Sequence, residues 1–465
     1  MPTPRTRRSR TGRTAQLAGV AGGQATRQLS TRTANVFRSD EAAAAALEAR
    51  SIEMADRLLT VLGTMKGAAL KFGQMLAMVD GGLVPESHRE QFQSRLAALH
   101  ANAPTVPWDR MRRQIESELG ERLASAYKDF DETPVAAASI GQVYRAVLRD
   151  GREVAVKVQY PGIDTAVRGD LKNLALFLKV AGRTMRSPLD ATALAAEVEA
   201  RIVDELDYVL EADHTRAMSR VFRGHPFIRV PAVVSDLSTT RVLTTTWLDG
   251  VPLRSVADAD PDTRRRTAEI LYRFYGLTPH RNGIYNADPH PGNCLVMADG
   301  TLAFLDFGLL GRLSLHDSAA ERATLRAVIE GDAEALARLS YERGFLSDPS
   351  AVDADDLLSM MRSVCWWFCE DREVEISSAA VNELPAQMAT PRASLALAQQ
   401  FSMPSTYAFR ARAEGQIPGL LSTLRPTINL HRVAREWVYD EPPVTGLGRV
   451  ERAWAMEAGH AAPAS

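Results

Sequence analysis

Two short segments near residue 300 hold the residue types that phosphoryl transfer requires. In "ADPHPGN", Asp288 precedes Asn293 by five positions, and in "DFG", Asp306 ends an apolar run. This spacing is typical of a kinase catalytic loop, in which the acid receives a hydroxyl proton and the amide holds magnesium. Asp306 is a natural magnesium ligand beside a phosphate. A hairpin turning at residues 299–300 would bring Asn293 and Asp306 to one metal cluster.

A second group of residues fits the phosphates and base of a nucleotide. "VAVK" follows an Asp-Gly turn, so residues 154–158 and 143–148 are predicted to pair as a hairpin. Ala155 and Lys157 then share one face, where Lys157 would reach the phosphates and Ala155 would leave room for a flat ring. The preceding loop has alanines where a kinase has glycines, which stiffens it. The residues expected to bind the nucleotide are Ala136, Ala137, Ala138, Ser139, Gly141, Val143, Ala155 and Lys157.

Acidic residues on a predicted helix over residues 191–219 would meet the lysines. A phosphate-binding lysine is usually oriented by a glutamate on a neighbouring helix, and Glu211 is assigned that role toward Lys157. At about 100° per residue Asp207 and Glu211 share a face of this helix, and Glu205 points in a clearly different direction from both. Glu205 and Asp207 are therefore left for Lys71.

Lys71 itself lies in "KFGQ", on a predicted helix over residues 51–79. Gly63, Gly67, Lys71 and Gln74 form one stripe, and glycines in a helix indicate close approach of another element. From the residues alone, a solvated stripe explains Lys71 and Gln74 equally well.

Other residues with reactive side chains are better explained by structural roles than by catalytic or metal-binding ones. His290 stands between two prolines, where a hydrogen-bonded structural role is favoured over a base or a ligand. Cys365 and Cys369 flank "WWF", which favours core packing over a metal or redox site.

Composition limits the class of protein. The 465 residues are 45% hydrophobic and 24% charged with a net charge of −2, as in an ordinary globular chain. Eight arginines and no acid fall within residues 1–39, which predicts a disordered tail or an arm on anionic lipid. Three cysteines and no long apolar run indicate a cytoplasmic protein with peripheral membrane contact at most.

Taken together, these motifs resemble the UbiB/AarF family of atypical, protein-kinase-like proteins, whose eukaryotic relatives are associated with mitochondrial and plastid quinones. The resemblance spans about residues 45–437. It is carried by "KFGQ" for the family's KxGQ signature, "AAAS" for its alanine-rich loop, "ELD" for its ExD motif, and "ADPHPGN" with "DFG" for its catalytic pair. Asn286 departs from the family, because many relatives carry His there, and no C-terminal membrane helices like those of some bacterial relatives are expected.

The resemblance implies binding of ATP and Mg²⁺ and a mostly helical α+β, bilobal kinase-like fold with an N-terminal helical extension over the active site. In such a fold Lys71 meets Glu205 and Asp207 and blocks a protein substrate. The domains expected are a basic tail (1–45), the extension with KxGQ (46–130), an N-lobe with a long helical insertion (131–250), a helical C-lobe (251–440) and a C-terminal tail (441–465).

The function expected is that of an ATPase or small-molecule kinase in isoprenoid-quinone or related lipid metabolism. Its partners would be a nucleotide, isoprenoid lipid or quinone precursors and their biosynthetic enzymes, without nucleic acid. The alternative is a non-catalytic nucleotide-binding regulator or scaffold of such a pathway. A conventional protein kinase is disfavoured, because the chain after Gly308 runs into a helix without an activation segment or Ala-Pro-Glu anchor.

Overall fold

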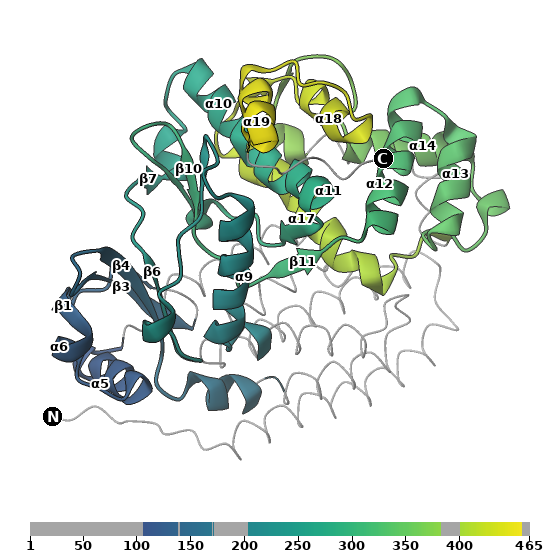
Figure 1. Ribbon diagram of the computed structural model, residues 1–465. Coiled ribbons are helices and arrows are strands. Elements are labelled where there is room, and N and C mark those ends of the chain that lie inside the picture. The colour runs from purple at the N-terminus through teal and green to yellow at the C-terminus, as the bar shows by residue number, and fades with distance from the viewer. Residues whose placement is uncertain (1–105, 138–139, 170, 172–202, 383–399, 458–465) are drawn as a thin grey trace, which may run out of the picture. The chain divides into compact units, whose positions relative to one another are not determined.

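The computed structural model of this chain describes residues 106–137, 140–169, 171, 203–382 and 400–457 (Figure 1). These residues belong to two compact units. The first holds the described chain up to Leu210 together with Val234–Thr246, and the second holds Glu211–Val233 and the chain from Trp247 onward. None of the described helices combines the length and the apolar character that a bilayer span needs.

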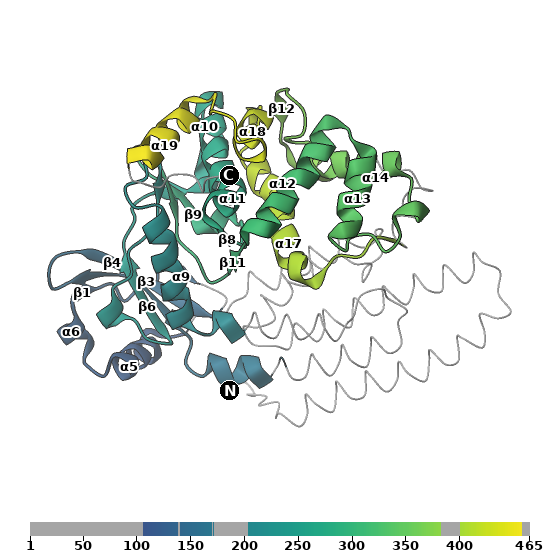
Figure 2. The same cartoon turned by 45° about the vertical axis from the view of Figure 1, so that its right-hand side comes forward.

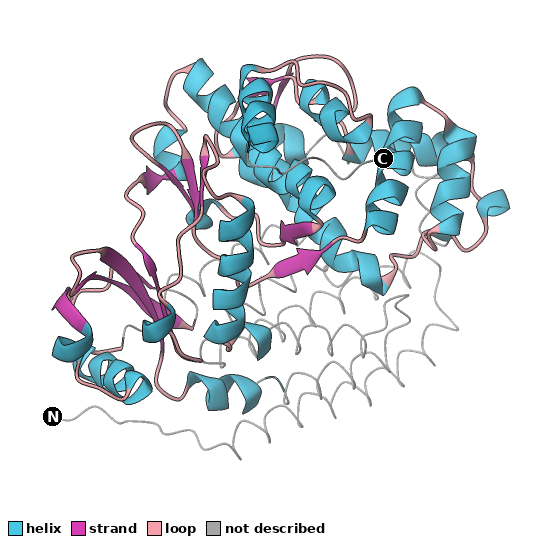
Figure 3. Cartoon of the chain, in the orientation of Figure 1, coloured by secondary structure: helices cyan, strands magenta, loops and turns pink. Residues whose placement is uncertain are grey.

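An antiparallel sheet forms the centre of the first unit (Figure 3). Its strands run in the order β1 (Tyr127–Phe130), β3 (Gly141–Leu148), β4 (Glu153–Gln159) and β6 (Val242–Thr246), and β2 (Ala136–Ala137) also pairs with β3. The unit also contains α5 (Trp108–Leu119), α6 (Leu123–Ala126) and the 3₁₀ turn η1 (Ser235–Leu237). Helix α5 covers one face of the sheet, where the Trp108 ring lies 5.3 Å from the rings of Phe130 and Tyr144.

The β3–β4 hairpin shows why this sheet has two different faces. Val154, Val156 and Val158 are fully buried, whereas Ala155 and Lys157 between them are half-buried. Successive side chains of a strand point to opposite faces, so the valines supply the core and Lys157 lies on the other side. Gly151 turns the hairpin with a φ of 90°. The hairpin predicted from the sequence is confirmed.

Gly141 allows the first residue of β3 to approach β4 closely. A Cβ atom at this position would lie 2.2 Å from the carbonyl oxygen of Val158, which is far inside van der Waals contact. Its φ is not in the left-handed region. Lack of space rather than backbone strain therefore requires glycine here.

The second unit contains three small sheets. The largest has the order β5 (Ile228–Arg229), β10 (Leu302–Phe304), β9 (Cys294–Val296) and β7 (Val251–Pro252). Two-stranded sheets join β8 (Ile284–Asn286) to β11 (Leu310–Arg312) and β12 (Val374–Glu375) to β13 (Thr427–Ile428). Strands β9 and β10 form the predicted hairpin around residues 299–300, which is confirmed.

Helices make up most of the second unit, as Figure 3 shows. The helix α9 (Tyr208–Val221) belongs to this unit from Glu211 onward. The other α-helices are α10 (Pro261–Tyr272), α11 (Thr278–Asn282), α12 (Leu315–Glu330), α13 (Ala333–Glu342), α14 (Ala354–Val364), α17 (Ser405–Ser422), α18 (His431–Val438) and α19 (Gly446–Glu457). Shorter turns are the π-helical η3 (Arg273–Leu277) and the 3₁₀ turns η2 (Leu253–Val256), η4 (Pro291–Asn293) and η5 (Pro349–Ala351). Helices α12, α13 and α14 lie side by side (Figure 2). In the core, the Phe274 ring stacks on that of Phe304 at 3.6 Å.

Several predicted elements need correction. The apolar runs at residues 227–236 and 240–248 predict two paired strands, but β5 pairs in parallel with β10 and β6 pairs with β4. The sequence predicts one helix over residues 108–123, but α5 ends at Leu119, because Gly120 takes a left-handed φ of 72° and caps it. The free cysteines Cys365 and Cys369 are buried among core residues, as expected.

Candidate active site

The segment 287–293 forms a short structured loop between β8 and β9. Pro291 begins the 3₁₀ turn η4, and the Nδ1 atom of His290 accepts the Gly292 backbone N–H at 3.1 Å. This contact gives His290 a structural role, as predicted. The Nδ2 atom of Asn293 donates to Oδ2 of Asp288 at 3.2 Å. The loop therefore holds the acid and the amide side by side.

The β9–β10 hairpin brings Asp306 to the same place. Cys294 pairs with Phe304, and the backbone N–H of Leu305 donates to the carbonyl of Asn293 at 3.0 Å. Asn293 and Asp306 thus occupy the same end of one hairpin. Oδ1 of Asp306 accepts the Gly308 N–H at 2.9 Å, which fixes the turn after the strand.

Asn286 ties the two loops together. Its side chain is buried; Nδ2 donates to the carbonyl of Asp306 at 2.8 Å, and Oδ1 accepts the backbone N–H of Asp288 at 2.9 Å. The sequence interpretation treated Asn286 only as a departure from the family, so this role was missed. Nothing in the local sequence distinguishes a cross-linking amide from an ordinary polar residue.

Helix α9 adds a buried acid beside the same turn. Glu211 is 5% exposed, and its Oε2 atom would lie 3.9 Å from a Cβ atom placed on Gly308. That same Cβ position is 3.3 Å from Oδ1 of Asp306, so both carboxylates border this glycine. One turn along α9, Nδ1 of His214 lies 3.0 Å from the Phe307 carbonyl, a contact that the sequence interpretation missed.

In the first unit, several predicted nucleotide-binding residues share one face of the sheet. Ala136 lies opposite Val143, and Val143 lies opposite Lys157. Directly opposite residues point to the same side, and Ala155 is two positions from Lys157, so all four side chains share a face. By the same alternation Gly141 lies on the face of Val143, whereas Ala137 points to the other side, and Ala138 and Ser139 lie outside the described residues.

Lys157 has an aromatic neighbour that the sequence interpretation did not foresee. Its Nζ atom lies 5.1 Å from the centroid of the fully buried Tyr208 ring, a cation–π distance. Tyr208 directly follows the "ELD" motif. Two residues beyond Lys157, Gln159 Nε2 donates to the Leu206 carbonyl at 2.9 Å and holds that motif beside β4. The predicted pairing of Lys157 with Glu211 joins the two units and stays a prediction.

The acids of "ELD" are arranged differently from the prediction. A helical turn ends at Glu205, and α9 begins only at Tyr208. Asp207 lies outside the helix, and its Oδ1 atom accepts the Val209 N–H at 2.9 Å, as an N-cap residue does. The expected shared helical face of Asp207 and Glu211 is therefore wrong, because the helix is interrupted between them. Lys71 and Gln74, their predicted regulators, lie outside the described residues.

The donor set around Asp288 suits magnesium. Carboxylate and amide oxygens are the ligands that this hard cation takes, usually together with phosphate oxygens. Beside these residues, burial raises the pKa of Tyr275 well above its usual value, with further contributions from Cys294 and from the negative charges of Asp288 and Asp306. Burial also raises the pKa of Cys294 to about 12, so this neighbouring thiol stays protonated.

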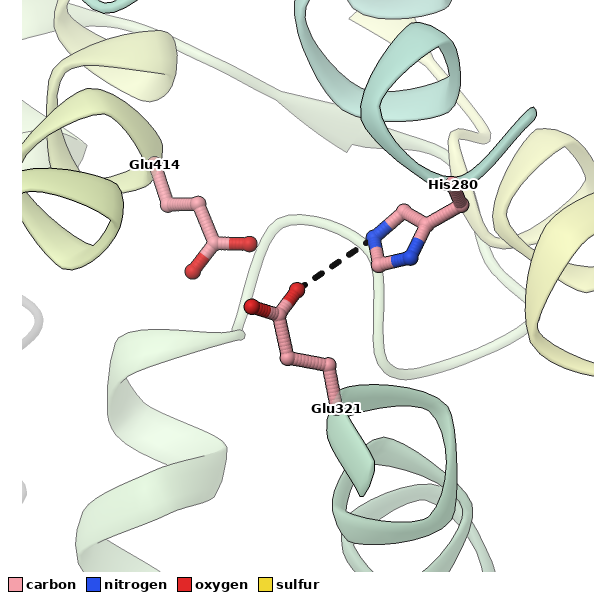
Figure 4. Close-up of side chains that lie close together, drawn as sticks. All are labelled: His280, Glu321 and Glu414. Carbon is pink, nitrogen blue, oxygen red and sulfur yellow. Dashed lines mark ion pairs between the residues drawn. The ribbon is translucent and has the colours of Figure 1, made fainter. Parts of the chain in front are cut away.

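A second group of metal-type donors lies among helices α11, α12 and α17. His280, Glu321 and Glu414 point toward one another (Figure 4), with donor atoms within 4.8 Å. The Arg410 guanidinium already supplies a positive charge there, 2.7 Å from Glu414 and 3.5 Å from Glu321. A metal ion would have to displace this cation, so the group is better described as a buried ion-pair cluster.

Comparisons with known proteins identify the family of this chain. The family model of the ABC1 atypical kinase-like domain matches residues 98–340. The chain belongs to the ABC1 atypical kinase-like family. The predicted UbiB/AarF membership and the α+β, bilobal protein-kinase-like fold are thereby confirmed.

Relatives of this ABC1 chain come from several kingdoms. The chloroplastic protein ACTIVITY OF BC1 COMPLEX KINASE 7 of Arabidopsis thaliana is 30% identical over 80% of this chain and 52% of its own length. Atypical kinase COQ8B, a mitochondrial protein of Rattus norvegicus, is 32% identical over 63% of this chain and 55% of its own length. The ABC1 chain therefore spans about half the length of these two relatives.

A solved structure is also similar to this ABC1 chain. The Mycobacterium tuberculosis protein Rv3197, solved in complex with erythromycin, is 28% identical with a TM-score of 0.63. The similarity covers 87% of this chain and all of that one.

Proposed function

We propose that this protein binds Mg-ATP and transfers or hydrolyses its terminal phosphoryl group. The observation that carries the proposal is the meeting of Asp288, Asn293 and Asp306 at one end of the β9–β10 hairpin, locked by Asn286. A structural hairpin does not need two carboxylates and an amide gathered at one end, whereas phosphoryl transfer does.

Each residue has a distinct role in this proposal. Asn293 and Asp306 would hold the metal ion, which neutralises phosphate charge when bound. Asp288 would orient the attacking hydroxyl and accept its proton. Lys157 would bind the phosphates from its face of the sheet, with Glu211 orienting it. Catalysis would then consist of positioning and charge neutralisation.

The acceptor that we propose is a small molecule or water rather than a protein. Helix α12 begins at Leu315, soon after Gly308, so the chain leaves little room for a peptide-binding activation segment. We place the activity in isoprenoid-quinone or related lipid metabolism, because relatives named COQ8 belong to the same family. We further propose that Lys71 and Gln74, with Glu205 and Asp207, regulate access to the site.

The proposal is tested by thermal unfolding with ATP or ADP, with and without magnesium, followed by phosphate release. Wild-type protein should be stabilised by Mg-nucleotide, and Asp306→Asn should lose most of this stabilisation because a metal ligand carboxylate is gone. Asp262→Asn removes an exposed acid on α10 and is the matched control. Lack of nucleotide stabilisation in the wild type would contradict the proposal. Stabilisation without turnover under any lipid or phenol stimulus would favour the alternative, a non-catalytic regulator.

A further inference from the structure

A pocket of about 880 Å³ lies within the second unit, among the end of α9, α11, the start of α12, the end of α18 and α19. None of Asp288, Asn293 and Asp306 lines it. Its volume is in the range of sites that take small organic ligands.

The base of this pocket is a fixed ion network. Arg273 is 1% exposed, and it binds Glu436 at 2.6 Å and Glu451 at 2.8 Å. Arg281 binds the same two acids, at 3.1 Å and 2.8 Å. Gly448 allows α19 to lie on this network, since a Cβ atom there would come 2.5 Å from an Arg273 nitrogen. The two glutamates are thus fully engaged by arginines.

Apolar side chains form much of the wall. Phe222, Leu277 and Trp437 contribute buried surface. Leu315 and Met456, which also line the pocket, are each 73% exposed. Large apolar side chains open to water beside a concave surface indicate a place for an apolar ligand.

Among the residues that line the pocket, the charges that remain after pairing are positive. The other two acids of the lining are also paired, Asp440 with Arg322 at 2.9 Å and Glu441 with Arg435. Arg220 on α9 and Arg452 on α19 line the pocket as exposed side chains and form no ion pair with another described residue. A pocket with apolar wall residues and two guanidinium groups that form no ion pair with a described residue is complementary to an amphipathic anion.

We propose that this pocket binds a free amphipathic anion, with an apolar chain or ring system against Phe222 and Trp437 and one phosphate or carboxylate group between Arg220 and Arg452. None of the residues proposed to bind the nucleotide lines this pocket, so the test of this proposal does not depend on whether the protein binds ATP.

The test measures binding of decyl phosphate, used below its critical micelle concentration. Binding is monitored by the change in tryptophan fluorescence and by the shift of the thermal unfolding midpoint. Trp437 and Trp454 line the pocket among six tryptophans in the chain. Wild-type protein should bind decyl phosphate saturably, and more tightly than decanol or decyltrimethylammonium. The double variant Arg220→Gln/Arg452→Gln should weaken binding of the phosphate by about tenfold, equivalent to about 1.4 kcal/mol, and leave decanol binding unchanged.

Two further variants control for charge and for folding. Arg338→Gln/Arg449→Gln removes the same net charge from residues outside the lining and should bind decyl phosphate like the wild type. Ala455→Trp should fill the pocket and abolish binding while keeping a cooperative unfolding transition. Equal binding of the cationic amphiphile, unchanged affinity in the Arg220→Gln/Arg452→Gln variant, or binding only to phosphatidic acid vesicles would overturn the proposal.

Discussion

At the scale of single residues, Asn286 links two loops of the candidate site. One buried amide satisfies a backbone donor of the loop 287–293 and a backbone acceptor of the DFG turn. Without Asn286 both backbone groups would lose this hydrogen bond. Each unsatisfied buried polar group lowers the free energy of unfolding by about 1–3 kcal/mol. The position of Asp288 relative to Asp306 therefore depends on a residue that itself has no reactive group.

Replacing Asn286 by Ala should lower the free energy of unfolding by about 1–3 kcal/mol, because both hydrogen bonds are lost. Chemical denaturation measures this loss. Asn282→Ala, which removes an exposed amide at the end of α11, is the matched control and should change stability little. If the two variants were equally stable, the link between the loops would not matter energetically.

At the scale of elements, a substitution at Gly141 measures how much the close approach of β3 to β4 matters for stability. In Gly141→Ala the new Cβ atom would meet the Val158 carbonyl oxygen at 2.2 Å, so the strands must separate. Overpacking of this kind typically costs about 1–3 kcal/mol. Gly169→Ala is the control, since its Cβ would meet nothing within 4 Å and alanine favours its helical backbone. Thermal unfolding should show a loss for the first variant and none for the second.

The elements that the sequence predicts correctly are those defined by neighbouring residues. Valines alternating after an Asp-Gly turn define the β3–β4 hairpin, and the turn at 299–300 defines β9–β10 in the same way. The same local signals mark Asp288, Asn293 and Asp306 as candidates, because each follows or precedes a short apolar strand. Their closeness follows from the hairpin.

The features that sequence reasoning missed depend on distant partners. Strand β5 pairs with β10, which lies more than seventy residues later, and an apolar run does not specify its partner. The interruption of the helix at Asp207 is hidden because aspartate inside a helix and aspartate as an N-cap differ only in backbone conformation. Tyr208 beside Lys157 and His214 beside Phe307 are also contacts that only the folded chain defines.

At the scale of the second unit, two buried ion-pair clusters hold helices together. The network of Arg273 joins η3 to α18 and α19, through Glu436 and Glu451. The cluster of Arg410 joins α17 to α12 and α11, through Glu321 and His280. Burying charges is costly unless they are balanced, so the protonation of each group matters for the stability of the unit.

Glu321 makes the second cluster sensitive to pH. Burial, with the neighbouring charge of Glu414, raises the pKa of Glu321 to about 8, even though Arg410 opposes the shift. Burial and the charge of Arg410 lower the pKa of His280 well below its usual value, so the imidazole stays neutral. The positive charge of Arg343 also favours the ionised form of Glu321, but burial and the charge of Glu414 outweigh both arginines, so Glu321 keeps its proton at neutral pH.

The folded protein thus holds a proton that the unfolded chain releases near pH 4.5. The stabilising effect of this proton is complete below that pH and is lost as the pH rises through about 8. Glu321→Gln keeps a neutral side chain at every pH, so its free energy of unfolding should rise relative to the wild type between pH 5 and pH 8. Denaturant titrations across this range measure the difference, with Glu373→Gln as an exposed-acid control. A difference that stays constant with pH would show that Glu321 is already ionised beside Arg410.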